Sequence, residues 1–154
     1  MSKRANLFIC LLIAGMLITS CSKKSTVVNV NNNCTYSNAT NAQVNFTILS
    51  GSAQFFPLNV TGGYTYVAGY GLKGILVYRV NSTQFVAFER SCTQDGCNNT
   101  KALVWVQTGN TAVKDTTCGS MFNIFDGSIQ QGPASIALYQ YHTTWDGNQL
   151  HVYN

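Results

Sequence analysis

Six cysteines are the side chains of this 154-residue chain that offer the most reactive chemistry, and their positions separate them into groups. Cys10 lies inside an apolar run near the start of the chain, and Cys21 follows directly after that run. The other four are Cys34, Cys92, Cys97 and Cys118. A thiol can be acylated, can form a disulfide or can ligate a metal ion, so compartment and spacing decide which chemistry each cysteine performs.

Residues 1–20 predict a bacterial lipoprotein signal peptide. The basic residues Lys3 and Arg4 precede the apolar run Leu7 to Ile18, which is short for a membrane-spanning helix. The run ends in Leu-Ile-Thr-Ser-Cys at 17–21, which resembles a lipobox, the motif whose cysteine is diacylated and becomes the new N-terminus. We therefore expect Cys21 to be the lipidation site. The protein is then anchored to a membrane of the bacterial cell envelope, outside the cytoplasm and facing the periplasm.

The remainder of the chain divides into a tether and one domain. Residues 21–41 consist mostly of Ser, Thr and Asn with little to bury, so we expect a flexible tether, followed by a folded domain over residues 42–154. Only 9% of residues are charged, and the net charge of +4 falls to +2 once Lys3 and Arg4 leave with the signal. This charge is too small for electrostatic binding of nucleic acid.

The domain has the pattern of an all-β protein. Residues 43–49 alternate polar and apolar side chains, which is the period of a half-buried strand, and turn signals recur along the rest of the chain. We expect strands at 43–49, 64–67, 74–80, 84–88, 102–106, 136–141 and 149–153. No stretch shows a convincing helical period, so the pattern predicts an antiparallel sandwich or barrel.

Two cysteine-containing segments resemble the cluster-binding loops of Rieske iron–sulfur proteins. Residues 92–97 read Cys-Thr-Gln-Asp-Gly-Cys, and residues 118–124 read Cys-Gly-Ser-Met-Phe-Asn-Ile, followed by Gly-Pro-Ala at 132–134. The family patterns are Cys-x-His-x-Gly, often followed by another Cys, and Cys-Pro-x-His-Gly-Ser-x-Phe-Asp with a later Gly-Pro-Ala. The resemblance covers roughly residues 55–154. It implies a Rieske-like β-sandwich or barrel with a small loop-rich subdomain.

The ligand positions of that family are largely replaced. A Rieske 2Fe–2S cluster needs two thiolates on one iron and two imidazoles on the other. Cys92 keeps the first cysteine position, but Gln94 stands at the first histidine position, Asp115 at the second cysteine and Cys118 at the second histidine. The supporting loop residues Gly119, Ser120, Gly132 and Pro133 remain. We therefore expect a vestigial cluster site that holds no cofactor.

The resemblance also implies a disulfide at this site. Some Rieske proteins join their two cluster loops by a disulfide, whose first cysteine matches Cys97 and whose second falls next to Cys118. We expect Cys97–Cys118, with Cys92–Cys118 as the rival, and the pairing of Cys34 stays open. A zinc site is an alternative, with thiolates from Cys92, Cys97 and Cys118 and a carboxylate from Asp115. However, structural zinc sites usually contain two closely spaced pairs of ligands, and this chain has only one such pair, Cys92-x4-Cys97. An oxidising compartment also favours a disulfide, so we expect no metal.

No constellation of catalytic residues stands out in the chain. The two histidines, His142 and His151, lie in or beside predicted strands, where a solvent-facing position accounts for them. We therefore expect a protein that is not an enzyme and that binds or scaffolds an unidentified protein partner at the membrane surface. The alternative is a 2Fe–2S electron-transfer protein with altered ligands.

Overall fold

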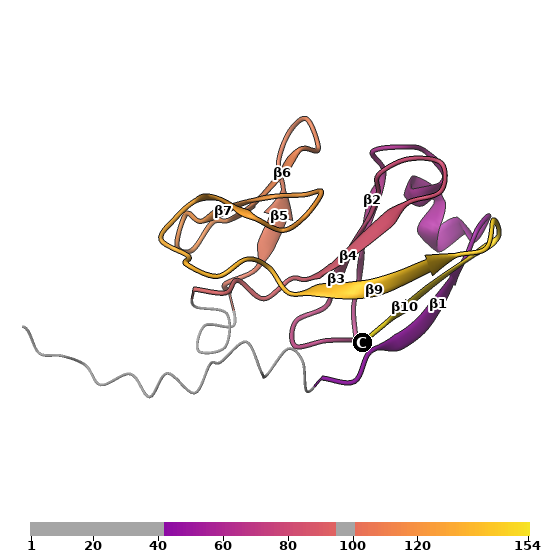
Figure 1. The fold of residues 1–154 in the computed structure, drawn as a ribbon, viewed down its shortest axis with the longest axis horizontal. Helices are drawn as coiled ribbons and strands as arrows, with labels where there is room; N and C mark the ends of the chain where they lie inside the picture. The colour runs from indigo at the N-terminus through magenta and orange to yellow at the C-terminus, as the bar shows by residue number, and fades with distance from the viewer. Residues whose placement is uncertain (1–41, 95–100) are drawn as a thin grey trace, which may run out of the picture. The chain divides into compact units, whose positions relative to one another are not determined.

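The computed structural model describes residues 42–94 and 101–154, which form two antiparallel sheets (Figure 1). The larger sheet has the order β1 (Asn45–Leu49), β10 (Gln149–Tyr153), β9 (Gln140–Trp145), β4 (Phe85–Glu89), β3 (Ile75–Arg79) and β2 (Tyr64–Val67). The smaller sheet has the order β5 (Val104–Val106), β6 (Ala112–Asp115), β7 (Met121–Asn123) and β8 (Ile129–Gln131). A 3₁₀ helix, η1, spans Ala53–Asn59. Among the described residues, no helix is long and apolar enough to cross a membrane.

The strands of the six-stranded sheet differ in how many faces they bury. β1 alternates exposed and buried residues and pairs with β10 from Asn45 opposite Tyr153 to Leu49 opposite Gln149. β3 and β4 are buried on both faces, because Ile75 and Ala87 belong to one core cluster whereas Leu76 and Phe88 belong to another. The central strands are therefore continuous apolar runs, and the outer strand alternates.

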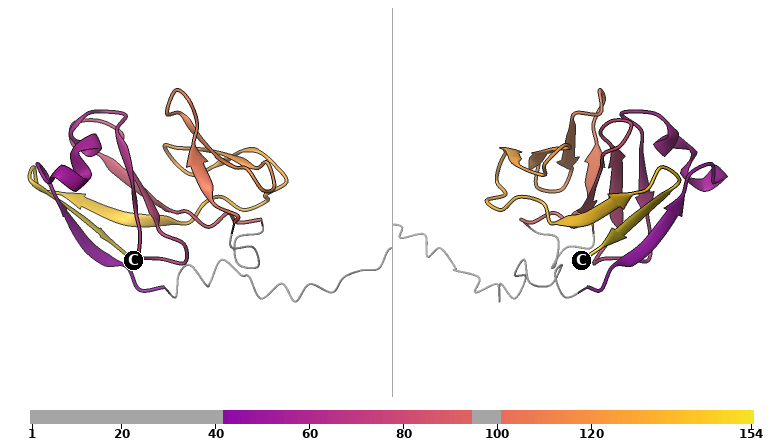
Figure 2. Two further views of the ribbon diagram at one scale, coloured as in Figure 1. Left: turned by 180° about the vertical axis from the view of Figure 1, so that it is seen from behind. Right: turned by 45° about the vertical axis from the view of Figure 1, so that its right-hand side comes forward.

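The four-stranded sheet is an insertion between two strands of the larger one. The chain leaves the larger sheet after β4, forms β5 to β8, and returns in β9, which pairs with β4 at Ala87–Tyr141 and Phe88–Gln140. Views from two further sides show the same arrangement (Figure 2). A shared core holds the sheets together, because Leu76 and Phe88 of the larger sheet pack with Val113 and Phe122 of the smaller one.

Most of the predicted strands are confirmed, and the all-β prediction is correct, but one strand is misplaced. The strand predicted at 136–141 begins only at Gln140, where pairing with β4 starts. Before that point Ile136 is exposed and Leu138 packs into the core as irregular backbone, with its N–H donating to Gly127 O at 3.0 Å. The sequence analysis also missed β6, β7 and β8, each of only three or four residues.

Candidate functional site

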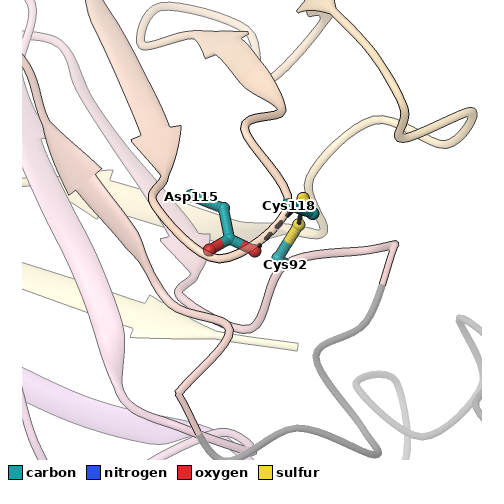
Figure 3. Close-up of side chains that lie close together, drawn as sticks. All are labelled: Cys92, Asp115 and Cys118. Carbon is teal, nitrogen blue, oxygen red and sulfur yellow. Dashed lines mark hydrogen bonds between the residues drawn. The ribbon is translucent and has the colours of Figure 1, made fainter.

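Three of the four predicted ligand positions come together in the structure. Cys92 follows β4, Asp115 is the last residue of β6, and Cys118 lies in the turn between β6 and β7. The ligand atoms of these three side chains all lie within 4.8 Å of one another, and Figure 3 shows them converging. The Cys92 and Cys118 sulfurs are 3.6 Å apart, and the Cys118 sulfur is 3.3 Å from Asp115 Oδ2. We call Cys92, Asp115 and Cys118 the thiol–carboxylate triad.

The turn that carries Asp115 and Cys118 is closed by backbone hydrogen bonds. Asp115 N donates to Ser120 O and Gly119 N donates to Asp115 O, both at 2.9 Å. Gly119 adopts φ +83°, a left-handed conformation that a side chain disfavours. Thr117 N donates to Asp115 Oδ1 at 2.7 Å, which leaves Oδ2 directed at Cys118. The turn thereby presents one carboxylate oxygen and one sulfur on the same side.

Ser120 connects the triad to the Gly132–Pro133 loop. Its side chain is fully buried, and its Oγ accepts a hydrogen bond from Ala134 N at 2.9 Å. The same Oγ lies 3.0 Å from the Cys118 sulfur, and Ser120 N donates to that sulfur at 3.5 Å. Two polar groups of one residue therefore surround the Cys118 sulfur.

A buried carboxylate holds the chain just before Cys92. Glu89 is 1% exposed and accepts hydrogen bonds from Leu72 N, Lys73 N and Ser91 N at 2.7, 3.0 and 3.0 Å. The Tyr141 hydroxyl donates to Glu89 Oε2 at 2.9 Å, and burial together with the Glu89 charge raises the pKa of Tyr141. The Glu89 carboxylate thus joins the end of β4 to the 69–74 turn and to β9.

Beyond Glu89, backbone contacts fix the position of the segment that contains Cys92. Cys92 N donates to Ala102 O at 3.1 Å, and Val104 N donates to Arg90 O at 2.9 Å. The turn of Asp115 and Cys118 joins the same segment through Thr117 Oγ1, which donates to Lys101 O at 3.2 Å. The two loops of the triad are therefore held together beside the start of β5 and the end of β6.

Burial is the main influence on the pKa of the Cys92 thiol. The Cys92 side chain is 1% exposed, and this burial raises the pKa of its thiol, although the Gln94 backbone N–H acts in the opposite direction. Burial also lowers the pKa of the Lys73 ammonium, which interacts electrostatically with Glu89, Asp115 and Cys92. A cation therefore lies near the triad that the sequence analysis did not assign to this site.

The remaining predicted site residues lie apart from the triad or outside the described residues. Gln94 is exposed and its side chain is not part of the triad. Cys92 and Cys118 are free thiols in the structure, since their 3.6 Å separation exceeds a disulfide bond of about 2.05 Å. Cys21, Cys34 and Cys97 lie outside the described residues, so the pairing of Cys97 with Cys118 and the lipidation of Cys21 stay predictions.

The sequence analysis missed two other features beside the triad. Glu89 lies three residues before Cys92 but occupies no ligand position of the motif, and only the fold reveals the relation of Lys73 to Cys92. The Arg90 guanidinium lies 4.0 Å from the Tyr66 ring centre and 4.5 Å from that of Trp105. Within the described residues, its Nε and Nη2 are buried without hydrogen-bond partners, so this arginine is held mainly by the aromatic rings.

The donor set does not fit a Rieske cluster. Two irons need four ligands, two of them imidazoles, whereas the triad supplies two sulfurs and one carboxylate. His142 and His151 lie on β9 and β10, where their rings flank Tyr153 at centroid distances of 5.3 and 4.9 Å. Neither histidine belongs to the group of converging ligands found among the described residues.

Comparisons with known proteins show the fold. No protein-family model and no curated protein matches the chain. A chain from the complex of reduced oxygenase and oxidized ferredoxin in carbazole 1,9a-dioxygenase is similar, with 21% identity, coverage of 72% of this chain and 94% of that chain, and a TM-score of 0.50. A chain from a variant oxygenase and ferredoxin complex of the same dioxygenase has 14% identity, coverage of 71% and 28%, and a TM-score of 0.48. The first of these two similarities shows that the chain has the predicted Rieske-like fold.

Proposed function

We propose that this protein is a lipid-anchored component of the bacterial cell envelope whose Rieske-like domain has lost its 2Fe–2S cluster and serves as a binding module. In this proposal the domain transfers no electrons through such a cluster and catalyses no reaction. The anchor at Cys21 holds it at the membrane surface facing the periplasm, where it binds a protein partner.

The donor set at the former ligand positions is the observation that supports this proposal most strongly. Cys92 alone retains its ligand type, while Gln94 is exposed and the other two positions hold Asp115 and Cys118. A thiolate where imidazole is required and a carboxylate where thiolate is required change both the charge and the softness of the ligands. The turn and the Ser120 hydrogen bonds that the resemblance leads us to expect at this position are present, which supports a fold related to that of cluster-binding proteins.

Anaerobic reconstitution with ferrous iron and sulfide tests the loss of the cluster. We expect the full chain, purified in detergent, to stay colourless and to retain no acid-labile sulfide after desalting. Uptake of two irons and two sulfides per chain by the native protein would overturn the proposal. The triple variant Gln94→His, Asp115→Cys and Cys118→His is the matched control, because it restores two thiolates and two imidazoles, and we expect partial cluster uptake.

Labelling with fatty acid tests the anchor separately. Cys21→Ala removes the predicted acylation site, so we expect the uncleaved precursor to lack lipid and to incorporate no labelled fatty acid. Cys34→Ser is the matched control and leaves labelling unchanged. Persistent lipid labelling of Cys21→Ala contradicts the proposed anchor without affecting the reconstitution result.

A further inference from the structure

We propose that Cys92, Asp115 and Cys118 form a mononuclear site for a divalent transition-metal ion of the zinc class, with one coordination position left for water or a partner's ligand atom. This site goes beyond the proposed function, which is that of a lipid-anchored binding module without a 2Fe–2S cluster. It departs from the expectation of no metal, because the structure places the ligand atoms of Cys92, Asp115 and Cys118 within 4.8 Å of one another.

Two of the three separations within the triad suit one tetrahedral ion, and the third, between the Cys92 sulfur and the Asp115 carboxylate, is at most 4.8 Å. Two thiolates bound to the same ion at about 2.3 Å lie about 3.8 Å apart, and a thiolate and a carboxylate oxygen bound at about 2.0 Å lie about 3.5 Å apart. The observed separations are 3.6 Å for the two sulfurs and 3.3 Å for Cys118 sulfur and Asp115 Oδ2. Small movements of the side chains therefore complete the coordination geometry.

The carboxylate and its neighbours are already oriented for binding. Thr117 N donates a hydrogen bond to Asp115 Oδ1, so Oδ2 is the carboxylate oxygen that faces the Cys118 sulfur. Ser120 Oγ accepts hydrogen bonds from Ala134 N and from the Cys118 thiol, 3.0 Å away, and its hydroxyl can donate to that sulfur once Cys118 is a thiolate. Ser120 N is a second donor to the same sulfur. Hydrogen bonds of this kind stabilise a metal-bound thiolate and orient it.

Burial and ligand type narrow the choice of ion. Asp115 is 0% exposed, and buried charges in proteins are normally paired or coordinated to metal ions. Two sulfur donors exclude calcium and magnesium, which take oxygen ligands, and favour zinc or chemically similar ions. A divalent ion lowers the net charge of the ionised triad from three negative charges to one. The Lys73 ammonium interacts electrostatically with Asp115 and Cys92 and offsets the remaining negative charge.

Cobalt binding is the direct test, because tetrahedral Co²⁺ bound to thiolate is coloured. The full chain, purified in detergent and reduced under argon with a phosphine, is titrated with Co²⁺ and then with Zn²⁺. We expect saturation at one Co²⁺ per chain with a thiolate-to-cobalt charge-transfer band, and loss of the band when Zn²⁺ replaces it. We also expect excess Zn²⁺ to raise the melting temperature by about 5 °C or more.

Variants locate the site. Cys118→Ser changes one atom of a half-buried side chain, and Asp115→Asn keeps the side-chain shape, so both suit this test. We expect each to weaken Co²⁺ binding on the order of 100-fold, since each removes one of three protein ligands. Cys34→Ser and His151→Gln are matched controls for the loss of a thiol and an imidazole elsewhere, and they leave the titration unchanged. Circular dichroism confirms that each variant is folded.

Three results would overturn the metal site. The first is no stoichiometric Co²⁺ uptake by the reduced native chain. The second is equal affinity in the native chain and in folded Cys118→Ser and Asp115→Asn. The third is a quantitative Cys92–Cys118 disulfide in protein isolated from the cell envelope without reductant, which peptide mapping detects. The proposed function is overturned by uptake of iron and sulfide, and none of these three results involves such uptake. Failure of the metal site is therefore distinct from failure of the proposed function.

Discussion

The two sheets of this domain divide structural and chemical roles between them. The six-stranded sheet has strands of four to six residues, and two of them, β3 and β4, are almost wholly buried. The four-stranded sheet has strands of three or four residues, and the end of its internal strand β6 and the following turn carry Asp115 and Cys118. The comparison indicates that the larger sheet supplies the stability with which the smaller one holds reactive side chains in place.

The shared core is where the two regions depend on each other. Phe88 of β4 and Phe122 of β7 are each 0% exposed and belong to one cluster. The small sheet therefore has no separate apolar core among the described residues. It follows that the triad's geometry depends on packing against β3 and β4 as well as on the turns around it.

The largest expected loss of stability comes from removing one large side chain from the shared core. Phe122→Ala removes a fully buried ring, and we expect a loss of about 4 kcal/mol in the free energy of unfolding. Because the core is shared, unfolding followed by urea stays a single transition. Phe56→Ala is the control at a side chain 70% exposed, with a change within about 0.5 kcal/mol. A Phe122→Ala protein that unfolds in two separate steps would show that the sheets are independent.

The second effect concerns the Glu89 carboxylate. Glu89→Gln replaces an acceptor of four hydrogen bonds with an amide whose NH₂ faces backbone donors, so we expect a loss of about 3 kcal/mol. Tyr141→Phe removes only one of the four donors and should cost about 1 kcal/mol. Urea denaturation measures both variants. Equal losses would mean that the hydrogen bond from the Tyr141 hydroxyl, and not those from the 69–74 turn, accounts for the stability that Glu89 contributes.

The smallest effect lies at the turn beside the triad. Gly119→Ala forces a side chain into φ +83°, and we expect a loss of about 1 kcal/mol, although no atom lies within 4 Å of the added Cβ. Gly119→Asn tolerates the left-handed conformation better and should cost less. Thermal unfolding compares the two variants. If alanine and asparagine are equivalent, backbone conformation is not what this glycine provides.

The same contrast explains how much could be predicted from the sequence. The alternation in β1 and the apolar runs of β3 and β4 indicate strands, because long strands have a regular burial pattern. β7 and β8 are too short for a pattern, and Ile136–Tyr139 has β propensity but packs as irregular chain. Tertiary packing overrides local propensity at these positions.

At the candidate site, the motif order located Cys92, Asp115 and Cys118 but could not say which of their atoms meet. Gln94 belongs to the same motif, yet its exposed side chain does not join the triad. Lys73 lies 42 residues before Asp115 in the chain and approaches the triad only through the fold. Glu89 lies three residues before Cys92, but no motif indicates its hydrogen bonds to Leu72 N and Lys73 N. Long-range contacts of this kind leave no local pattern in the sequence.

Iron and acid-labile sulfide content tests the central claim most directly. The native protein is extracted anaerobically from the cell envelope in detergent, and both elements are quantified per chain alongside the visible spectrum. The account predicts no acid-labile sulfide and no absorbance of a 2Fe–2S cluster, because the triad lacks the ligands that two irons require. Two irons and two sulfides per chain, with the corresponding visible bands, would contradict it.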